Sequence, residues 1–462
     1  MKVDRRAFIV AALGVGGVGV ASRLATWDET TDRDRTPAPM PPEPPDDAVP
    51  TVAFRGLLPG GRPCVKPTIA VDGGRAMVVA IDVAGGTEMG LACWTSGDGG
   101  RHWGAPAPIA TWPAASRAMF DPWLLTDHRG RFHLVHASVA REPVADRSPV
   151  VFRRSTDDGV SWGGPEGVAG IGDRPMLGIG PGGRRLAIAC AMVDPASLPT
   201  RPLRSPDEAS AAIAKIRRLC GLFVSGDRGR SWSAVAGPEG MIHGIPFGVA
   251  CDDGDRIACC WIDSDGKGST SRSLACTTVD GGRTWQTTTL VERLQPDREH
   301  GFNGGRFPVL AQGGGGALHL AYVGANGKGL SVRSSRDWRA WGEAIPLASD
   351  AAEEVRFPSI AARGPMVHAT WMERRGGRYR MWYRGSGDRG TSWSAPILLD
   401  PPTAPDSPED GFYVSSDDDQ ASVADDGAGT AHAVWAARAS AGGTLEVRHA
   451  VIAWKVAEPS GP

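Results

Sequence analysis

The apolar positions of this chain gather in short runs that are bounded by polar turns. Seven of these runs, each five to seven residues long, lie at 77–81, 132–136, 186–191, 257–262, 317–323, 366–371 and 431–435. Apolar runs of this length between turns are typical of buried β-strands. We therefore expect an all-β fold in which each of these strands lies inside its own sheet.

A short turn motif, Ser-x-Asp-x-Gly-x-x-Trp, recurs between the apolar runs. Five copies, one of which begins with Thr, occupy 96–103, 155–162, 225–232, 278–285 and 386–393, and a shortened copy without its glycine occupies 335–341. In a tight hairpin the Ser and Asp side chains bond nearby backbone N–H groups, Gly adopts a positive φ, and Trp packs the turn against its sheet. Copies spaced by roughly 50 to 70 residues indicate an array of one supersecondary unit.

Each unit follows the same order: a first strand, a polar turn, the apolar second strand, a variable loop, a third strand, the turn motif and a fourth strand. Repeated four-stranded antiparallel units predict a single β-propeller. The second strands give seven blades, with six blades as the alternative. The last unit lacks the motif and a fourth strand, whereas 51–58 forms a spare strand at the other end. We expect this N-terminal strand to close the ring and remove the free sheet edges.

The first fifty residues lie outside the expected propeller. Arg5 and Arg6 precede an apolar, Gly-rich stretch that ends near residue 21, as in a twin-arginine export signal. Residues 36–50 contain seven prolines and predict an extended linker. The expected divisions are an export signal (1–25), a Pro-rich linker (26–50), the propeller (51–456) and a tail (457–462). The protein is then periplasmic or extracellular, with an uncleaved signal anchor as the alternative to cleavage.

Composition narrows the classes of partner. The 62 Gly and 37 Pro interrupt the chain too often for long helices, and the mixed charges sum to only -2. The chain therefore lacks the excess of positive charge that binding to nucleic acid or an anionic membrane would require. No Cys/His spacing resembles a zinc site, so we expect no cofactor, and we expect a monomer. Buried thiols are the preferred state of the cysteines, with Cys190–Cys220 as the bridge if one forms; the adjacent Cys259 and Cys260 must face opposite sides of a strand.

One long insertion, 194–220, replaces the loop between the second and third strands of the third unit. Ser205 and Glu208 form a capping box with Pro206 at the first helical position, and 209–219 continues as a short helix. A loop of this length is either functional or a decoration of the surface.

The turn motifs must all lie on one rim of the ring, here called the box rim, because strand direction alternates within a blade. The opposite rim carries the approaches to the first strands and the loops between second and third strands, and propellers commonly bind ligands there. The chain places guanidinium and carboxylate groups together on this opposite rim, which suits an acidic or hydroxyl-rich ligand. These residues are Lys66, Asp82, Asp121, Asp146, Arg174, His243, Asp263, Glu299, His300, Arg306, Glu354, Arg356, Glu373, Tyr413 and 417–419.

The turn motifs and the blade order resemble the sialidase (neuraminidase) superfamily, whose propellers carry BNR or Asp-box repeats. The resemblance covers nearly all of 51–454. Arg306-Phe307-Pro308 and Arg356-Phe357-Pro358 are similar to the Arg-x-Pro core of the family's Phe-Arg-Ile-Pro motif, and Arg174-Pro175 is a weaker third copy. In the family such arginines grip the carboxylate of the substrate, which suits the planar fork of a guanidinium.

The resemblance also implies catalytic roles. The family uses a Tyr nucleophile assisted by a Glu, and an Asp acid/base on a loop near the first blades. Tyr413 lies on the approach to a first strand and is the candidate nucleophile. Glu373 or Glu354 is the candidate that polarises it, and Asp146 or Asp82 is the candidate acid. Where the family places its motif before the first box, this chain has Val65-Lys66-Pro67, and Lys offers only a point charge.

Three functions follow from this pattern. The first is an exported exo-glycosidase that hydrolyses a terminal acidic sugar. The second is a non-catalytic propeller that binds a glycan or a protein at the same rim. The third is a polysaccharide lyase in which His243 or His300 acts with Tyr413 as base and acid. Asp417, Asp418 and Asp419 offer carboxylates to Ca²⁺, although such a charge run is usually solvated.

Overall fold

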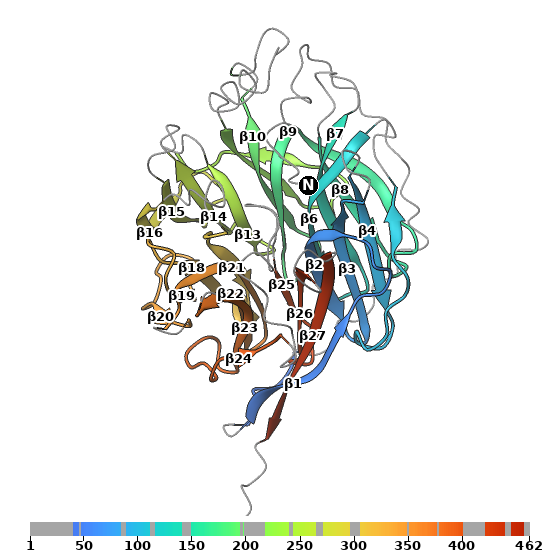
Figure 1. Cartoon of the computed structure of the whole chain (residues 1–462). Coiled ribbons are helices and arrows are strands. Elements are labelled where there is room, and N and C mark those ends of the chain that lie inside the picture. Colours follow the sequence, from blue (N-terminus) through green and yellow to red (C-terminus); the bar gives the residue numbers. More distant parts are fainter. Residues whose placement is uncertain are drawn as a thin grey trace, which may run out of the picture.

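The computed structural model describes residues 40–45, 48–84, 89–110, 116–140, 149–194, 197, 218–239, 244–264, 271–295, 305–348, 351–376, 378–400, 421–438 and 445–456. In this part of the chain the strands build seven antiparallel blades arranged as a ring (Figure 1). The all-β fold and the count of seven are therefore confirmed.

The first three blades run from β2 to β12. Blade one contains β2 (Cys64–Asp72), β3 (Arg75–Asp82), β4 (Gly90–Ser96) and β5 (Ala107–Ile109). Blade two contains β6 (Ser116–Thr126), β7 (Phe132–Ala140), β8 (Pro149–Ser155) and the first half of β9 (Gly163–Ile179). Blade three contains the second half of β9, then β10 (Leu186–Val193), β11 (Arg218–Ser225) and β12 (Ser233–Val235). Because β9 serves both blades, their strands form one continuous sheet.

The next three blades are separate four-stranded sheets. Blade four contains β13 (Ile245–Cys251), β14 (Ile257–Ser264), β15 (Ser271–Thr278) and β16 (Gln286–Leu294). Blade five contains β17 (Val309–Gln312), β18 (Leu318–Val323), β19 (Leu330–Ser335) and β20 (Ile345–Pro346), with a 3₁₀ turn at Gly314–Gly316. Blade six contains β21 (Glu354–Arg363), β22 (Met366–Arg375), β23 (Arg378–Ser386) and β24 (Ile397–Leu398).

Blade seven closes the ring with the two ends of the chain. It contains β25 (Ser422–Asp425), β26 (Ala431–Arg438), β27 (Leu445–Val456) and, as its outer strand, β1 (Ala48–Leu57). β1 pairs with β27 from Ala48 opposite Val456 to Leu57 opposite Arg448, with a bulge between Val52 and Phe54. The two strands run together at the edge of the ring in Figure 1. The expected closure by an N-terminal strand is confirmed.

Hydroxyl groups tie neighbouring blades together around the axis. Thr68 Oγ1 accepts a bond from the Leu124 amide at 3.2 Å, and Ser422 Oγ accepts one from the Ile69 amide at 3.3 Å. These bonds join blades one and two, and blades seven and one. Inside the first strands lies a central cavity of about 370 Å³, to which all seven blades contribute lining residues. A propeller of this size thus leaves a hollow axis.

The recurring turn motif has the hydrogen bonds that its residue types predict. In the first copy, Ser96 Oγ accepts a bond from the Gly100 amide at 2.9 Å, and Asp98 Oδ1 accepts one from the His102 amide at 2.9 Å. The shortened copy keeps the bond between Ser335 and Asp337, at 3.3 Å. There Trp338 takes the left-handed position, with φ of 65°, and its buried ring donates from Nε1 to Gly316 O at 2.6 Å. Burial of the ring compensates for a conformation that Gly adopts more easily.

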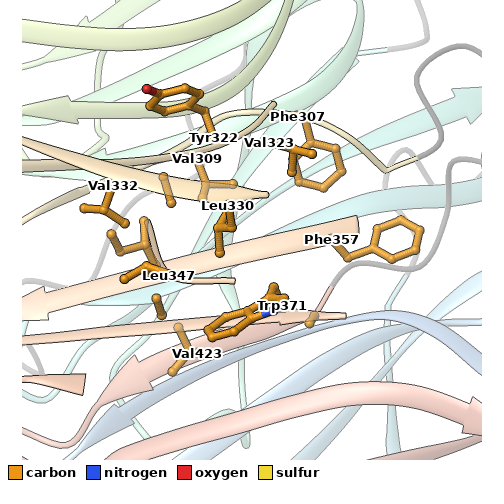
Figure 2. Close-up of a cluster of buried hydrophobic side chains, with 14 of the residues drawn as sticks. Phe307, Val309, Tyr322, Val323, Leu330, Val332, Leu347, Phe357, Trp371 and Val423 are labelled. Atoms are coloured by element: carbon orange, nitrogen blue, oxygen red, sulfur yellow. The ribbon is translucent and has the colours of Figure 1, made fainter. Parts of the chain in front are cut away.

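The core is a set of apolar layers between blades. The largest layer spans blades four to seven, and Figure 2 shows part of it around Val309, Leu330 and Trp371. All eight cysteines of the chain lie in the described residues and are free thiols, seven of them buried, as expected. Cys259 faces the layer shared with blade three and Cys260 the layer shared with blade five, so their expected opposite orientation is confirmed.

Two expectations about local structure are wrong, one of them in part. Cys190 is opposite Gly221, the neighbour of Cys220, so the side chains of Cys190 and Cys220 point to opposite faces of the sheet and no bridge between them is feasible. Arg218 and Leu219, expected to end a helix, begin β11 because they pair with β10. The rest of the expected helix lies outside the described residues.

Candidate functional site

The first strands share an irregularity at the rim opposite the boxes. In four blades a residue before a proline has a left-handed backbone: Lys66 (φ 52°), Asp121 (52°), Arg174 (48°) and Phe357 (49°). The strand register shifts at each of these positions. A bulge re-aims the side chain that it carries, and such strained backbone is often found at functional sites.

The bulged residues form an arc from blade to blade near the start of the first strands, and none of them is among the residues that line the central cavity. Lys66 and Asp121 are ion-paired across blades one and two. The Arg174 guanidinium carbon lies 5.0 Å from the centre of the Phe247 ring. Phe247 stacks on Phe307, with their ring centres 4.5 Å apart. Phe307 and Phe357 pack edge to face, with their ring centres 6.2 Å apart, and Figure 2 shows these two rings at one end of the core layer. The arc is charged in blades one to three and aromatic in blades four to six, and its members are at most 5% exposed.

A second cluster lies beside the arc, between blades five and six. Glu354 opposes Arg374 on the next strand, and Arg374 opposes Tyr379 on the third, so the three residues form one row across the blade. The Tyr379 hydroxyl donates to Glu354 Oε2. Arg356, two residues along the first strand, donates from Nη2 to Glu354 Oε1 at 2.7 Å, and Arg306 reaches the same oxygen from blade five at 2.6 Å. We call Glu354, Arg356, Tyr379 and Arg306 the Glu354 cluster.

Electrostatics keep the carboxylate charged and the phenol neutral. Burial raises the pKa of Glu354, but the charge of Arg356, together with hydrogen bonds from Arg356, Tyr379 and Arg306, leaves that pKa below its usual value. Burial is the largest cause that raises the pKa of Tyr379 well above its usual value, and the hydrogen bond to Glu354 adds to it. At neutral pH the cluster therefore holds a protonated phenol against an ionised carboxylate.

The structure brings together only some of the residues that the sequence pointed to. Arg306 and Arg356 meet at Glu354, whereas Arg174 lies in the arc over Phe247. Glu373 is fully buried and faces the other side of blade six, where it accepts a bond from Trp371 Nε1 at 2.9 Å and pairs with Arg375.

Three further candidates lie away from the Glu354 cluster or outside the description. Asp82 lies at the end of a strand in blade one, where Arg62 Nη1 is 2.8 Å from its Oδ2. Blade seven separates it from blade six. Tyr413 and Asp146 lie outside the described residues, as do His243, Glu299, His300 and 417–419.

Tyr379 is the member of the cluster that sequence reasoning missed. It lies just after the turn between second and third strands of blade six, and these turns share a rim with the approaches to the first strands. With only four Tyr in the chain, a search of both kinds of loop on that rim would have found it beside Tyr413. Its contact with Glu354 depends on strand register, which the sequence pattern does not fix within one residue.

Neither a metal centre nor a membrane-spanning helix is found among the described residues. No group of three or more His, Cys, Asp or Glu in this part of the chain is arranged to hold a metal ion. Among the described residues, no helix is long and apolar enough to cross a membrane.

Comparison with known proteins identifies the repeat and the fold. Residues 87–369 match a protein family described as BNR repeat-like domain. No curated protein matches the chain.

Three solved structures illustrate the likeness. A protein of unknown function from Dyadobacter fermentans DSM 18053 is 12% identical, with coverage of 88% of this chain and 99% of that chain and a TM-score of 0.46. Ulvan lyase, a polysaccharide lyase, is 10% identical, with coverage of 87% and 95% and a TM-score of 0.47. A sialidase from Trypanosoma rangeli is 11% identical, with coverage of 84% and 55% and a TM-score of 0.37, so this chain spans about half of it. At these identities the likeness concerns the fold alone.

Proposed function

Because the chain belongs to the BNR repeat-like domain family, whose repeats build this propeller, we propose that it is a glycosidase that acts on an acidic sugar. The observation that carries the proposal is the Glu354 cluster, in which a tyrosine hydroxyl, a carboxylate and two guanidinium groups meet at the end of two neighbouring blades. The rim on which it lies is the one that propellers commonly use for ligands.

The two guanidinium groups of the cluster support an anionic ligand. Arg306 and Arg356 both bind the same oxygen of the ionised Glu354 carboxylate, so two positive charges lie close together on this rim. The side chains of Arg306 and Arg356 are only 13% and 4% exposed, so solvent screens this charge weakly. A sugar carboxylate is attracted by these charges and fits the planar fork of a guanidinium with two parallel hydrogen bonds.

Tyr379 and Glu354 supply the chemistry that the proposal requires. The phenol attacks the anomeric carbon while its proton passes to Glu354, the carboxylate to which it already donates. A neutral phenol avoids bringing a second anion against an acidic sugar, and its raised pKa explains why it needs a base. For the acid that protonates the leaving group we favour Asp146, because Arg62 neutralises Asp82.

The arginine of the arc extends the proposal toward the axis. Arg174 is 5% exposed and lies over Phe247, near the start of the first strand of blade three. In the proposed complex it contacts a part of the sugar that lies farther from the bond to be broken. Its removal should therefore raise KM more than it lowers kcat.

A panel of fluorogenic glycosides of sialic and uronic acids tests the activity. We expect Tyr379→Phe and Glu354→Gln each to lower kcat at least about 10³-fold, because each removes a group that acts in the transition state. Tyr322→Phe, in the second strand of blade five, is the matched control and should retain activity. If Tyr413→Phe abolishes turnover and Tyr379→Phe does not, the nucleophile is Tyr413. Absence of turnover from every acidic glycoside, with retention of glycan on an array, would favour the non-catalytic binding function instead.

Export is proposed on the sequence alone. The pair Arg5 and Arg6 before an apolar stretch supports transport by the twin-arginine route. Replacement of both arginines by lysine should leave the protein in the cytoplasm, as cell fractionation would show. Equal export of the double variant would contradict the proposed route.

A further inference from the structure

Two cysteines of blade four are placed at the spacing of a disulfide. Cys259 on β14 and Cys276 on β15 are directly opposed in an antiparallel pair, so their side chains leave the same face of the sheet. Directly opposed residues in such a pair have Cα atoms about 4.5 or 5.5 Å apart, and disulfides span about 4.4–6.8 Å between Cα atoms. The backbone therefore needs no rearrangement to join them.

The surroundings of the two thiols differ in a way that gives them different roles. Both are at most 1% exposed, and Trp261 Nε1 donates to Cys259 Sγ at 2.7 Å. Cys276 Sγ lies 3.5 Å from Thr287 Oγ1. The hydrogen bond from Cys259 lowers the pKa of Cys276, whereas burial raises the pKa of Cys259. Cys276 is thus the thiol that ionises first and acts as the nucleophile.

A third thiol connects this pair with the surface. Cys220 lies on β11 of blade three and packs against the apolar layer that contains Cys259 and Cys276. It is partly exposed, whereas the other seven cysteines are buried. Among the chain's thiols it is therefore the one that an oxidant in solution reaches first.

We propose that Cys259 and Cys276 form a reversible disulfide, a modification site inside blade four, and that Cys220 admits the oxidant. The oxidant is a small-molecule or protein disulfide of the kind present in oxidising compartments. This inference uses no residue of the Glu354 cluster and stands independently of the proposed glycosidase.

The exchange balances in three steps. The Cys220 thiolate attacks the external disulfide and releases one external thiol. The Cys276 thiolate then attacks the Cys220 sulfur and releases the second external thiol. Finally the Cys259 thiolate attacks the Cys276 sulfur, and Cys220 leaves as a thiolate that takes up a proton. Two protein thiols have lost two electrons and two protons, and one external disulfide has become two thiols.

The neighbouring cysteine offers a matched control. Cys260 points to the opposite face, where its Sγ lies 3.5 Å from the carbonyl oxygen of Pro308 in blade five. It differs from Cys259 by one position in the chain but faces away from Cys276. If strand geometry determines the bridge, Cys276 must pair with Cys259, and Cys260 must remain a free thiol.

Peptide mass spectrometry of the full chain tests the site. The protein is incubated with oxidised glutathione, blocked with N-ethylmaleimide and digested with trypsin, which places Cys259 and Cys260 in 257–267 and Cys276 in 273–283. We expect these two peptides to be cross-linked, with a mass two hydrogens below their sum, and the link to vanish after treatment with dithiothreitol. Cys260→Ala should keep the link and Cys259→Ala should lose it, with circular dichroism to show that both variants fold.

The rate of formation tests the role of Cys220. Cys220→Ala should slow the cross-link at least about 10-fold without changing its final position, because the buried pair then meets the oxidant only during rare openings. An unchanged rate would overturn the role of Cys220. Absence of the link in the oxidised wild type, or its persistence in Cys259→Ala, would overturn the site itself.

Discussion

Replacement of Glu354 by Gln should destabilise the propeller far more than the same change at its neighbour Glu353. Glu354 is 8% exposed and its Oε1 accepts bonds from Arg306 at 2.6 Å and Arg356 at 2.7 Å. The glutamine variant removes the negative charge to which both buried guanidinium groups donate. Removing one partner of a buried ion pair typically costs about 3–5 kcal/mol.

Glu353 provides the control because its interaction is exposed. Its carboxylate lies 3.1 Å from Arg374 Nε, with side chains that are 41% and 34% exposed. Surface ion pairs contribute about 0–1 kcal/mol. Equilibrium urea unfolding, followed by tryptophan fluorescence at neutral pH, should therefore separate Glu353→Gln from Glu354→Gln by at least about 2 kcal/mol.

Two further measurements sharpen this test. Acetate or sulfate should restore part of the stability of Glu354→Gln, because an added anion replaces the lost charge between Arg306 and Arg356, and should leave Glu353→Gln unchanged. The pKa of Glu354 is lowered in the folded state, so its stabilising effect is present above the unfolded pKa of about 4.3 and is lost as pH falls through the folded value. Equal stability losses in the two variants, with no response to anions, would refute the assignment of the Glu354 cluster as an anion-binding site.

Other predictions concern the ring and its pH range. Burial lowers the pKa of His319 and His432 to about 4, whereas an unfolded histidine titrates near 6.5. Because the unfolded state then binds more protons below pH 6.5, the free energy of unfolding should fall between pH 6.5 and 4 in an acid titration followed by fluorescence. Constant stability over that range would contradict their burial. Trp338→Gly should cost about 2–4 kcal/mol in urea unfolding, because loss of the buried ring outweighs relief of its positive φ; a stabilised variant would contradict this. Deletion of residues 1–57, which removes β1, should expose the edge of β27 and cause aggregation in light scattering, whereas deletion of residues 1–39 should leave a monomer.

Local pattern was sufficient to predict the repeating unit. The turn motif depends on bonds within a few residues, such as Ser96 to Gly100 and Asp98 to His102, and so it can be recognised in any single copy. The shortened copy departs from the pattern because the contact that compensates for it, from Trp338 to Gly316, comes from outside the motif. A disulfide between Cys190 and Cys220 is not feasible for a related reason. A one-residue difference in register turns a side chain to the other face of the sheet.

The candidate site was less accessible to sequence reasoning. Arg306 and Arg356 were found because each lies in a local Arg-Phe-Pro sequence. Tyr379 and Glu354 became partners only through pairing across three strands, and Arg306 joined them from another blade, 48 residues away in the chain. Glu373 shows the same limit, because its register places it on the opposite face from Glu354.

The sequence by itself determined an all-β ring of seven four-stranded blades, closed by its own N-terminal strand, because alternating apolar runs and tight turns are set by short-range hydrogen bonding and burial. Tertiary structure alone decided which charged groups meet. The bulges aimed Lys66 at Asp121 and Arg174 at Phe247, and strand register brought Tyr379 to Glu354. These contacts join residues of different strands and blades, and their free energies depend on distances and burial that no local pattern encodes.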